Sequence, residues 1–289
     1  MTTPFPTVRS RLIADSDIDR VAAFLAKGFK RRSREYWLRA LERLAKHPTP
    51  ASFPRFGYLM EIDGLPIGVI LLIFSTVQNG SSCTVRCNVS SWYVEPTYRA
   101  HATLLISQAL RKKDITYVNI SPAWHVQRIV EAQGFSRYSN GQFVTFPALF
   151  PWTGDDVTVL GAGTRPDVAF EPFEWDILLA HADYGCTSFW VTTTERAYPF
   201  VFLPRIVKRC FPCAQLIYCR GIEDLVRFSK PIGRFLLSRG KPLLLIDANG
   251  PIPGLPGKYV EGAAPKYYRG PEPPRLGDLA YTEAAMFGL

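Results

Sequence analysis

One short segment of the chain brings together residue types that bind an anion. A predicted strand at 88–96 ends in Glu95 and Pro96, and two basic residues, Arg99 and His101, follow directly before helical apolar spacing begins. A strand that feeds a helix directs unpaired backbone N–H groups and the positive end of the helix dipole at one point. Arginine adds a permanent cation with a planar set of donors. The segment is therefore a candidate anion site.

The residues after this segment continue the alternation of strand and helix. A β-rich run covers 115–120, and Ser121 with Pro122 offers an N-cap followed by a proline suited to a first helical turn. The helix predicted there has one apolar face and ends at Gly134. Two strands joined by a crossover helix predict parallel or splayed neighbours in an α/β layer architecture.

The residues before the segment predict two helices and a hairpin. A short strand is expected at 9–14, then a helix capped by Asp15 and a second helix at 33–46 capped by Ser33. Strands at 56–62 and 66–77 are expected to form a hairpin across Asp63 and Gly64. A last strand is expected near 142–146.

This order of elements over residues 9–146, closed by Gly134 and Phe135, resembles the GNAT N-acyltransferase superfamily. The resemblance implies an α/β (α+β) fold with a mixed, splayed central sheet flanked by helices. In that family the fourth and fifth strands, here 84–94 and 115–120, part from each other. The acyl-pantetheine arm of acyl-CoA, the co-substrate, lies in the gap.

The resemblance also implies which residues hold the pyrophosphate of acyl-CoA. The family pattern Arg/Gln-x-x-Gly-x-Gly/Ala falls on Arg99, Ala102 and Leu104. Leu104 departs most from it, because glycine there lets the backbone approach a phosphate closely. The implied binding residues are Val94, Tyr98, Arg99, Ala100, His101, Ala102, Thr103 and Leu104.

Val130 stands where the family has a tyrosine that protonates the departing thiolate, and Ala123 stands where it has an asparagine. Nearby groups that could replace the acid are His125, Ser121 and Tyr138, and Glu95 is the candidate base.

Each of these four residues also has a purely structural interpretation. Ser121 suffices as a helix cap, Tyr138 as a strand residue, His125 as an exposed helix residue and Glu95 as a solvent-facing carboxylate before a turn.

The second half of the chain partly repeats the pattern of the first. A Pro- and Gly-rich stretch at 147–172 precedes a helix at 173–181, strands at 187–194, 198–203 and 214–219, a helical run at 222–239 broken at Pro231, and a strand at 242–247. We predict a GNAT-like domain at 1–150 and a second, reduced GNAT-like lobe at 151–289. A β-rich extension packed on the first domain is the alternative. Glu223 and Asp224 make the equivalent loop of the second lobe a poor phosphate site.

The composition is that of a folded protein. The chain has 289 residues, of which 47% are hydrophobic and 13% aromatic, which argues against disorder. It has no apolar run long enough to span a bilayer and no secretion signal at its start, so we expect a cytoplasmic protein. The six cysteines do not suggest a disulfide framework. Cys210 and Cys213 form a single Cys-x-x-Cys motif, with no second such motif and no nearby histidine, so we expect no metal.

The formal charge is +9, and residues 27–46 hold eight basic residues and two acidic ones. Basic charge suits a binder of the polyanion coenzyme A. Nucleic-acid binding and a solvated helix face are the competing interpretations. The leading hypothesis is an acyltransferase that moves an acyl group from acyl-CoA to an amine of a small molecule or peptide. The alternative is a catalytically inactive GNAT-fold protein that binds acyl-CoA or a metabolite, or acts as a scaffold.

Overall fold

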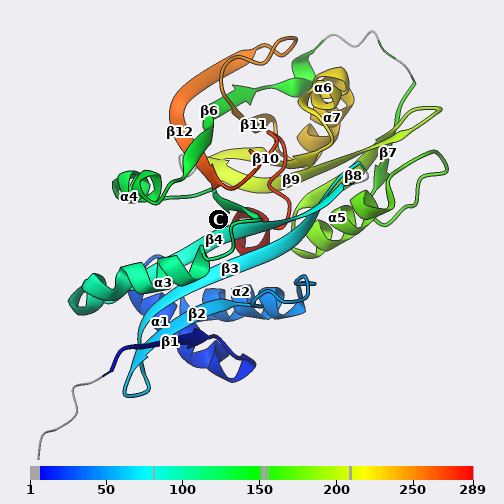
Figure 1. Ribbon diagram of the computed structural model, residues 1–289. Coiled ribbons are helices and arrows are strands. Elements are labelled where there is room, and N and C mark those ends of the chain that lie inside the picture. The colour runs from blue at the N-terminus through cyan, green and yellow to red at the C-terminus, as the bar shows by residue number, and fades with distance from the viewer. Residues whose placement is uncertain (1–6, 81, 151–153, 155, 208–209, 289) are drawn as a thin grey trace, which may run out of the picture. The chain divides into compact units, whose positions relative to one another are not determined.

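The computed structural model describes residues 7–80, 82–150, 154, 156–207 and 210–288 (Figure 1). The chain divides into two compact units. Unit 1 comprises Met1–Asn119 with Arg269–Glu272, and unit 2 comprises Ile120–Tyr268 with Pro273–Leu289. The division thus falls after residue 119, whereas the two predicted domains meet at 150. The assignment of 1–150 and 151–289 as separate GNAT-like domains stays a prediction.

Unit 1 contains a mixed sheet with the strand order β1-β2-β3-β4-β5. Neighbouring strands are antiparallel except for the parallel pair β4 and β5. The elements are β1 (Arg9–Leu12), η1 (Asp15–Asp17), α1 (Ile18–Gly28), α2 (Arg34–Lys46), β2 (Gly57–Ile62), β3 (Leu65–Asn79), β4 (Ser82–Val94), η2 (Pro96–His101), α3 (Ala102–Ala109) and β5 (Thr116–Asn119).

Helices cover both faces of this sheet. Tyr93 and Val94 are adjacent in β4, so their side chains point to opposite faces. The ring of Tyr93 lies 5.2 Å from that of Phe24 in α1. On the other face, a Cβ added to Gly68 would lie 3.0 Å from Leu105 of α3 and 3.2 Å from Val94. The sheet is therefore sandwiched between α1 and α3, and α2 packs against α1.

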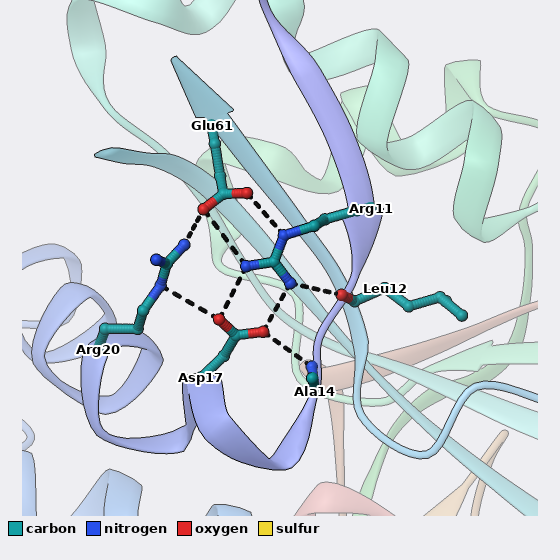
Figure 2. A network of polar contacts seen from close by, with 6 residues as sticks. All are labelled: Arg11, Leu12, Ala14, Asp17, Arg20 and Glu61. Carbon is teal, nitrogen blue, oxygen red and sulfur yellow. Dashed lines mark hydrogen bonds and ion pairs between the residues drawn. The ribbon is translucent and has the colours of Figure 1, made fainter. Parts of the chain in front are cut away.

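A network of ion pairs ties β1, β2 and the start of α1 together (Figure 2). Arg11 donates to both oxygens of Asp17, at 2.6 and 2.8 Å, and to Glu61 at 2.7 Å. Arg20 pairs with the same two carboxylates, and Asp17 also accepts the backbone N–H of Ala14 at 2.8 Å. The hydrogen bond from Arg11 is the main reason why the pKa of Asp17 falls to about 2.

The prediction that Asp15 caps the first helix is wrong. A turn of 3₁₀ helix, η1, precedes α1, so Asp17 rather than Asp15 contacts the backbone at the helix start, and Asp15 pairs with Arg55 at 3.0 Å. The second predicted helix is confirmed as α2, and so is its N-cap, because Ser33 Oγ accepts a hydrogen bond from the N–H of Tyr36 at 3.3 Å.

The predicted hairpin is confirmed as well. Asp63 and Gly64 have φ of 48° and 77°, as a tight two-residue turn between strands requires.

In unit 2 the strands are hydrogen-bonded in the order β12-β6-β11-β10-β9-β8-β7, again with mixed directions. Of these pairs only β10 and β11 are parallel. The elements are η3 (Trp124–Val126), α4 (Gln127–Ala132), β6 (Ser136–Thr145), η4 (Pro147–Leu149), β7 (Thr158–Gly161), α5 (Pro172–Asp183), β8 (Thr187–Thr192), β9 (Ala197–Val207), β10 (Phe211–Cys219), α6 (Ile222–Arg227), α7 (Ser229–Leu237), β11 (Leu243–Ala248), β12 (Gly257–Arg269) and the π-helix η5 (Ala284–Gly288). Its core combines buried phenylalanines with leucine, isoleucine and valine side chains.

Three expectations for unit 2 are corrected. Ser121 and Pro122 do not open a helix, because α4 begins only at Gln127 after the short η3. The helical run at 222–239 is interrupted at Phe228, and Pro231 lies in the first turn of α7, where its missing N–H is tolerated. After the strand at 242–247 no further strand was expected, but the long strand β12 follows there and pairs with β6. Neither unit has a described helix that combines the length and apolar character needed to cross a membrane.

Candidate functional site

In unit 1 the parallel strands β4 and β5 run together for only three residue pairs. Pairing begins at Arg86 with Thr116 and ends at Asn88 with Val118. Beyond Asn88, β4 continues to Val94 beside β3, but β5 no longer accompanies it. The predicted parting of the two strands is therefore present.

Asn88 marks the point where the strands part. Its side chain is buried, and Nδ2 donates to the carbonyl oxygens of Val118 and Val89, both at 3.2 Å. The amide thus bridges the two strands at their last paired position. Sequence reasoning missed this residue, because Asn88 lies among other polar residues of the strand, Arg86, Ser90 and Ser91, and does not stand out.

A β-bulge follows in the part of β4 that β5 does not accompany. Val69 of β3 pairs with Tyr93 and Leu71 pairs with Ser90, so two residues of β4, Ser91 and Trp92, oppose one residue of β3. Ser91 has a φ of 50°, which is unusual for a residue other than glycine. A bulge leaves its extra residue unpaired and disrupts the ladder locally, so this stretch of β4 is a candidate to present backbone groups to a ligand.

The segment predicted to be a phosphate-binding loop is helical. Residues 96–101 form η2, which runs into α3. The N–H of Tyr98 donates to the carbonyl of Glu95 at 2.9 Å, and the N–H of Ala102 donates to that of Arg99. These two N–H groups are therefore already bonded within the segment.

Several side chains of the segment are exposed to solvent. Arg99 is exposed, His101 is partly exposed, and neither forms a hydrogen bond or ion pair with any described residue. Ala100 and Thr103 are exposed, Tyr98 and Ala102 are partly exposed, and Leu104 is 49% exposed. Val94 is buried beside Leu105, so only its backbone could touch a ligand.

Glu95, the candidate base, lies between the end of β4 and η2 and forms an ion pair with α1. Its Oε1 lies 2.6 Å from Nζ of Lys27. The hydrogen bond and the negative charge of Glu95 raise the pKa of Lys27. This ion pair joins residues far apart in the sequence, and sequence reasoning missed Lys27.

The other three candidate residues lie in unit 2. His125 is exposed in η3 and forms a T-shaped contact with the ring of Trp124 at 5.7 Å. Ser121 Oγ donates to Oε1 of Glu283 at 2.5 Å. Tyr138 is buried in β6, where its ring contacts Tyr268. The structure therefore assigns no capping bond to Ser121, and it brings none of these three side chains together.

Val130, at the position of the family's acid, is 3% exposed and belongs to the buried face of α4. A tyrosine does lie against this helix from elsewhere in unit 2. The hydroxyl of Tyr267 accepts from Arg137 Nε at 2.9 Å and contacts Glu131 at 3.2 Å. Burial raises the pKa of Tyr267.

The corresponding loop of unit 2 is occupied by its own side chains. Arg220 donates to both oxygens of the buried Glu174, at 3.0 and 2.5 Å. A Cβ added to Gly221 would lie 2.0 Å from Oε1 of Glu223, so this carboxylate covers the N-terminus of α6. A phosphate group would meet this carboxylate at the helix start, as the acidic residues predicted.

Searches with the sequence find no matching family model and no matching curated protein. Comparison with solved structures finds proteins of the same fold. A putative acetyltransferase from Pyrococcus horikoshii has a TM-score of 0.57 at 12% identity, and the match covers 97% of this chain and 95% of that one.

Two further solved structures have a similar fold. A GCN5-related N-acetyltransferase from Anabaena variabilis has a TM-score of 0.58 at 10% identity, with 91% of this chain and 72% of that chain covered. Eis1 from Mycobacterium abscessus has a TM-score of 0.51 at 13% identity, with 91% and 73% covered. This chain therefore has the fold of the GNAT, or GCN5-related N-acetyltransferase, superfamily.

Proposed function

We propose that this chain transfers an acyl group from acyl-CoA to an amine. The observation that carries the proposal is the parting of β4 from β5 after Asn88, directly before Glu95 and the exposed Arg99. The GNAT fold supports it, because solved structures of this fold are described as acetyltransferases. The acceptor, a small-molecule or peptide amine, and the cytoplasmic location stay predictions.

The transfer requires few groups. The amine nitrogen attacks the thioester carbon, the carbon–sulfur bond breaks, and the proton lost by the amine passes to a base. Glu95 is the carboxylate at the end of β4 that could accept this proton. Backbone N–H groups of the bulge at Ser91 and Trp92 are candidates to stabilise the negative charge that develops on the thioester oxygen.

The phosphates of acyl-CoA would be held mainly by side chains. Leu104 replaces the glycine that permits close backbone approach, and the N–H groups of Tyr98 and Ala102 are already bonded to nearby carbonyls. Arg99 and His101 compensate, since a guanidinium forms charge-assisted bonds with phosphate oxygens.

The departing thiolate needs a proton donor or must leave unprotonated. Val130 cannot donate, Tyr138 is buried, and Ser121 already donates to Glu283. His125 is exposed, and an imidazole can give a proton near neutral pH. Of the three groups that could replace the family's acid, His125, Ser121 and Tyr138, we therefore take His125 as the candidate acid.

A second candidate function is an acyl-CoA-binding protein without activity. The ion pair of Glu95 with Lys27 favours it, because the carboxylate must give up or share this partner to accept a proton.

The experiment that separates the two combines calorimetry with acetyl-CoA and a longer acyl-CoA and a thiol-release assay over a panel of amines. Binding with amine-dependent thiol release supports the transferase. Binding without release from any amine supports the inactive binder, and no binding of either acyl-CoA contradicts both.

A further inference from the structure

The loop between α1 and α2 carries three consecutive cations, Lys30, Arg31 and Arg32. Lys30 and Arg31 are exposed and form no hydrogen bond or ion pair with any described residue. The guanidinium of Arg32 lies 4.5 Å from the centre of the Tyr36 ring. Three other cations of these helices, Arg20, Lys27 and Arg34, are paired with carboxylates, Arg34 with Asp19 at 2.7 Å. The loop therefore concentrates positive charge with little local compensation.

The loop has a defined shape. The N–H of Arg32 donates to the carbonyl of Phe29 at 2.8 Å, and Ser33 caps the helix that follows. The ring of Phe29 lies 5.3 Å from that of Trp37. The nearby carboxylate of Glu35 is bonded to its own backbone N–H and to Ser33. A ligand would thus meet three cations that project from an ordered backbone, so the loop itself does not have to be ordered on binding.

The loop is also held beside Glu95. The ring of Tyr93 packs directly on Gly28, where an added Cβ would lie 2.5 Å from it, and it lies 6.1 Å from the ring of Phe29. Lys27, one residue before Gly28, pairs with Glu95 at 2.6 Å. The cations begin only two residues after Gly28. An acceptor whose amine approaches Glu95 would therefore have this loop within reach of its other end.

We propose that the amine acceptor itself carries a carboxylate or phosphate group, and that Lys30, Arg31 and Arg32 bind this anionic group. The inference rests on the proposed acyl transfer and names the class of its acceptor. Three cations in a fixed loop raise the local concentration of an anionic acceptor and favour it over neutral amines. An amine with a second positive charge is disfavoured by the same field.

The test uses pairs of amines that differ in one anionic group. Phosphoethanolamine is compared with ethanolamine, and glycyl-glutamate amide with glycyl-glutamine amide, so that the phosphate and carboxylate arms are read separately. Thiol release at saturating acetyl-CoA gives kcat/KM for each amine. We expect at least one anionic amine to exceed its neutral counterpart by about tenfold or more, the range for one hydrogen bond to a charged group.

Matched variants locate the effect. Arg31→Glu is expected to abolish the preference, and Arg31→Lys to retain most of it. Lys46→Glu makes the same charge change on another exposed residue of this surface, about 18 Å further along α2 at 1.5 Å per residue. It is expected to leave the preference intact. All three variants should bind acetyl-CoA as the parent does.

Equal kcat/KM within both pairs, or an equal effect of Arg31→Glu and Lys46→Glu, would overturn the proposal. If no amine is acylated, the proposed transfer fails. Calorimetric titration of the acetyl-CoA-saturated protein with the same amines then tests separately whether the loop binds an anionic group. Binding of an anionic amine that is lost in Arg31→Glu upholds the site, and no difference between the amines overturns it. Tight binding of duplex DNA, weakened equally by both charge reversals, would also overturn it.

Discussion

The side-chain amide of Asn88 donates to the carbonyl of Val118 at 3.2 Å, at the last residue pair that joins β4 to β5. This bond fixes the position from which the two strands diverge. The candidate groups of unit 1, the bulge at Ser91, Glu95 and Arg99, all follow it along the chain.

Asn88→Ala should therefore affect both stability and ligand binding. The buried carbonyl of Val118 would lose its side-chain donor, which costs about 1–3 kcal/mol in the free energy of unfolding. We also expect weaker binding of coenzyme A, because the divergence of the strands is no longer fixed. Urea unfolding and calorimetry measure the two effects.

Asn249→Ala is the matched control for Asn88→Ala. It removes a similar amide bond to a carbonyl, that of Tyr138 at 3.0 Å in unit 2, together with the bond that Asn249 Oδ1 accepts from the N–H of Asn140 at 2.7 Å. It should lower stability and leave the affinity for coenzyme A unchanged. Equal affinity in the parent and Asn88→Ala would show that the bridge is only structural.

Arg99→Ala should weaken the binding of coenzyme A by about 1–3 kcal/mol, the range for losing a charge-assisted hydrogen bond. Arg111→Ala removes another exposed arginine from the region just after α3 and should have little effect. Calorimetry gives both affinities. If Arg99→Ala binds as tightly as the parent, the phosphate site is not on η2 and α3.

His125→Ala should lower turnover by about 10²–10⁴-fold if the imidazole protonates the thiolate, with the affinity for coenzyme A unchanged. Unchanged turnover in His125→Ala would show that coenzyme A leaves as the thiolate without receiving a proton, since the pKa of an ordinary thiol is about 8.5. In that event Val130→Tyr should raise the rate. Because Val130 is buried, this larger side chain is expected to cost about 1–3 kcal/mol of stability, so its melting temperature is the control.

Stability should fall at low pH because of Asp17. Its pKa is about 2 in the folded state against an ordinary value of 3.8. A carboxyl with a lowered pKa stabilises the fold fully above the ordinary value, and this contribution is lost as the pH falls toward 2. The difference corresponds to about 2 kcal/mol. Urea unfolding of Asp17→Asn should show this loss already at pH 7. Asp15→Asn, at an exposed ion pair, should change stability little.

The elements that the sequence predicted well have strong local signals. The apolar spacing of α2 with its cap Ser33, and the turn at Asp63 and Gly64, are local properties and are confirmed. The strand β12 was missed because its first residues are mostly exposed and lack apolar alternation. Its partner β6, more than 100 residues earlier in the chain, defines it as a strand.

The candidate site was predictable only in part. Arg99 and Glu95 follow from the strand-to-helix pattern, but the pairing of Glu95 with Lys27 and of Ser121 with Glu283 joins distant parts of the sequence. The helical form of residues 96–101 was also missed, since Pro96 suits the first turn of a helix as well as a loop.

The most direct test of acyl transfer follows both products in one reaction, with the released thiol measured by absorbance and the acylated amine by mass spectrometry. The parent protein with acetyl-CoA and a reactive amine should give the two in equal amounts. Glu95→Gln should lower the rate about 10²–10⁴-fold, with the affinity for acetyl-CoA unchanged. Acetyl-CoA that binds to the parent but yields no acylated amine from any amine would contradict the account.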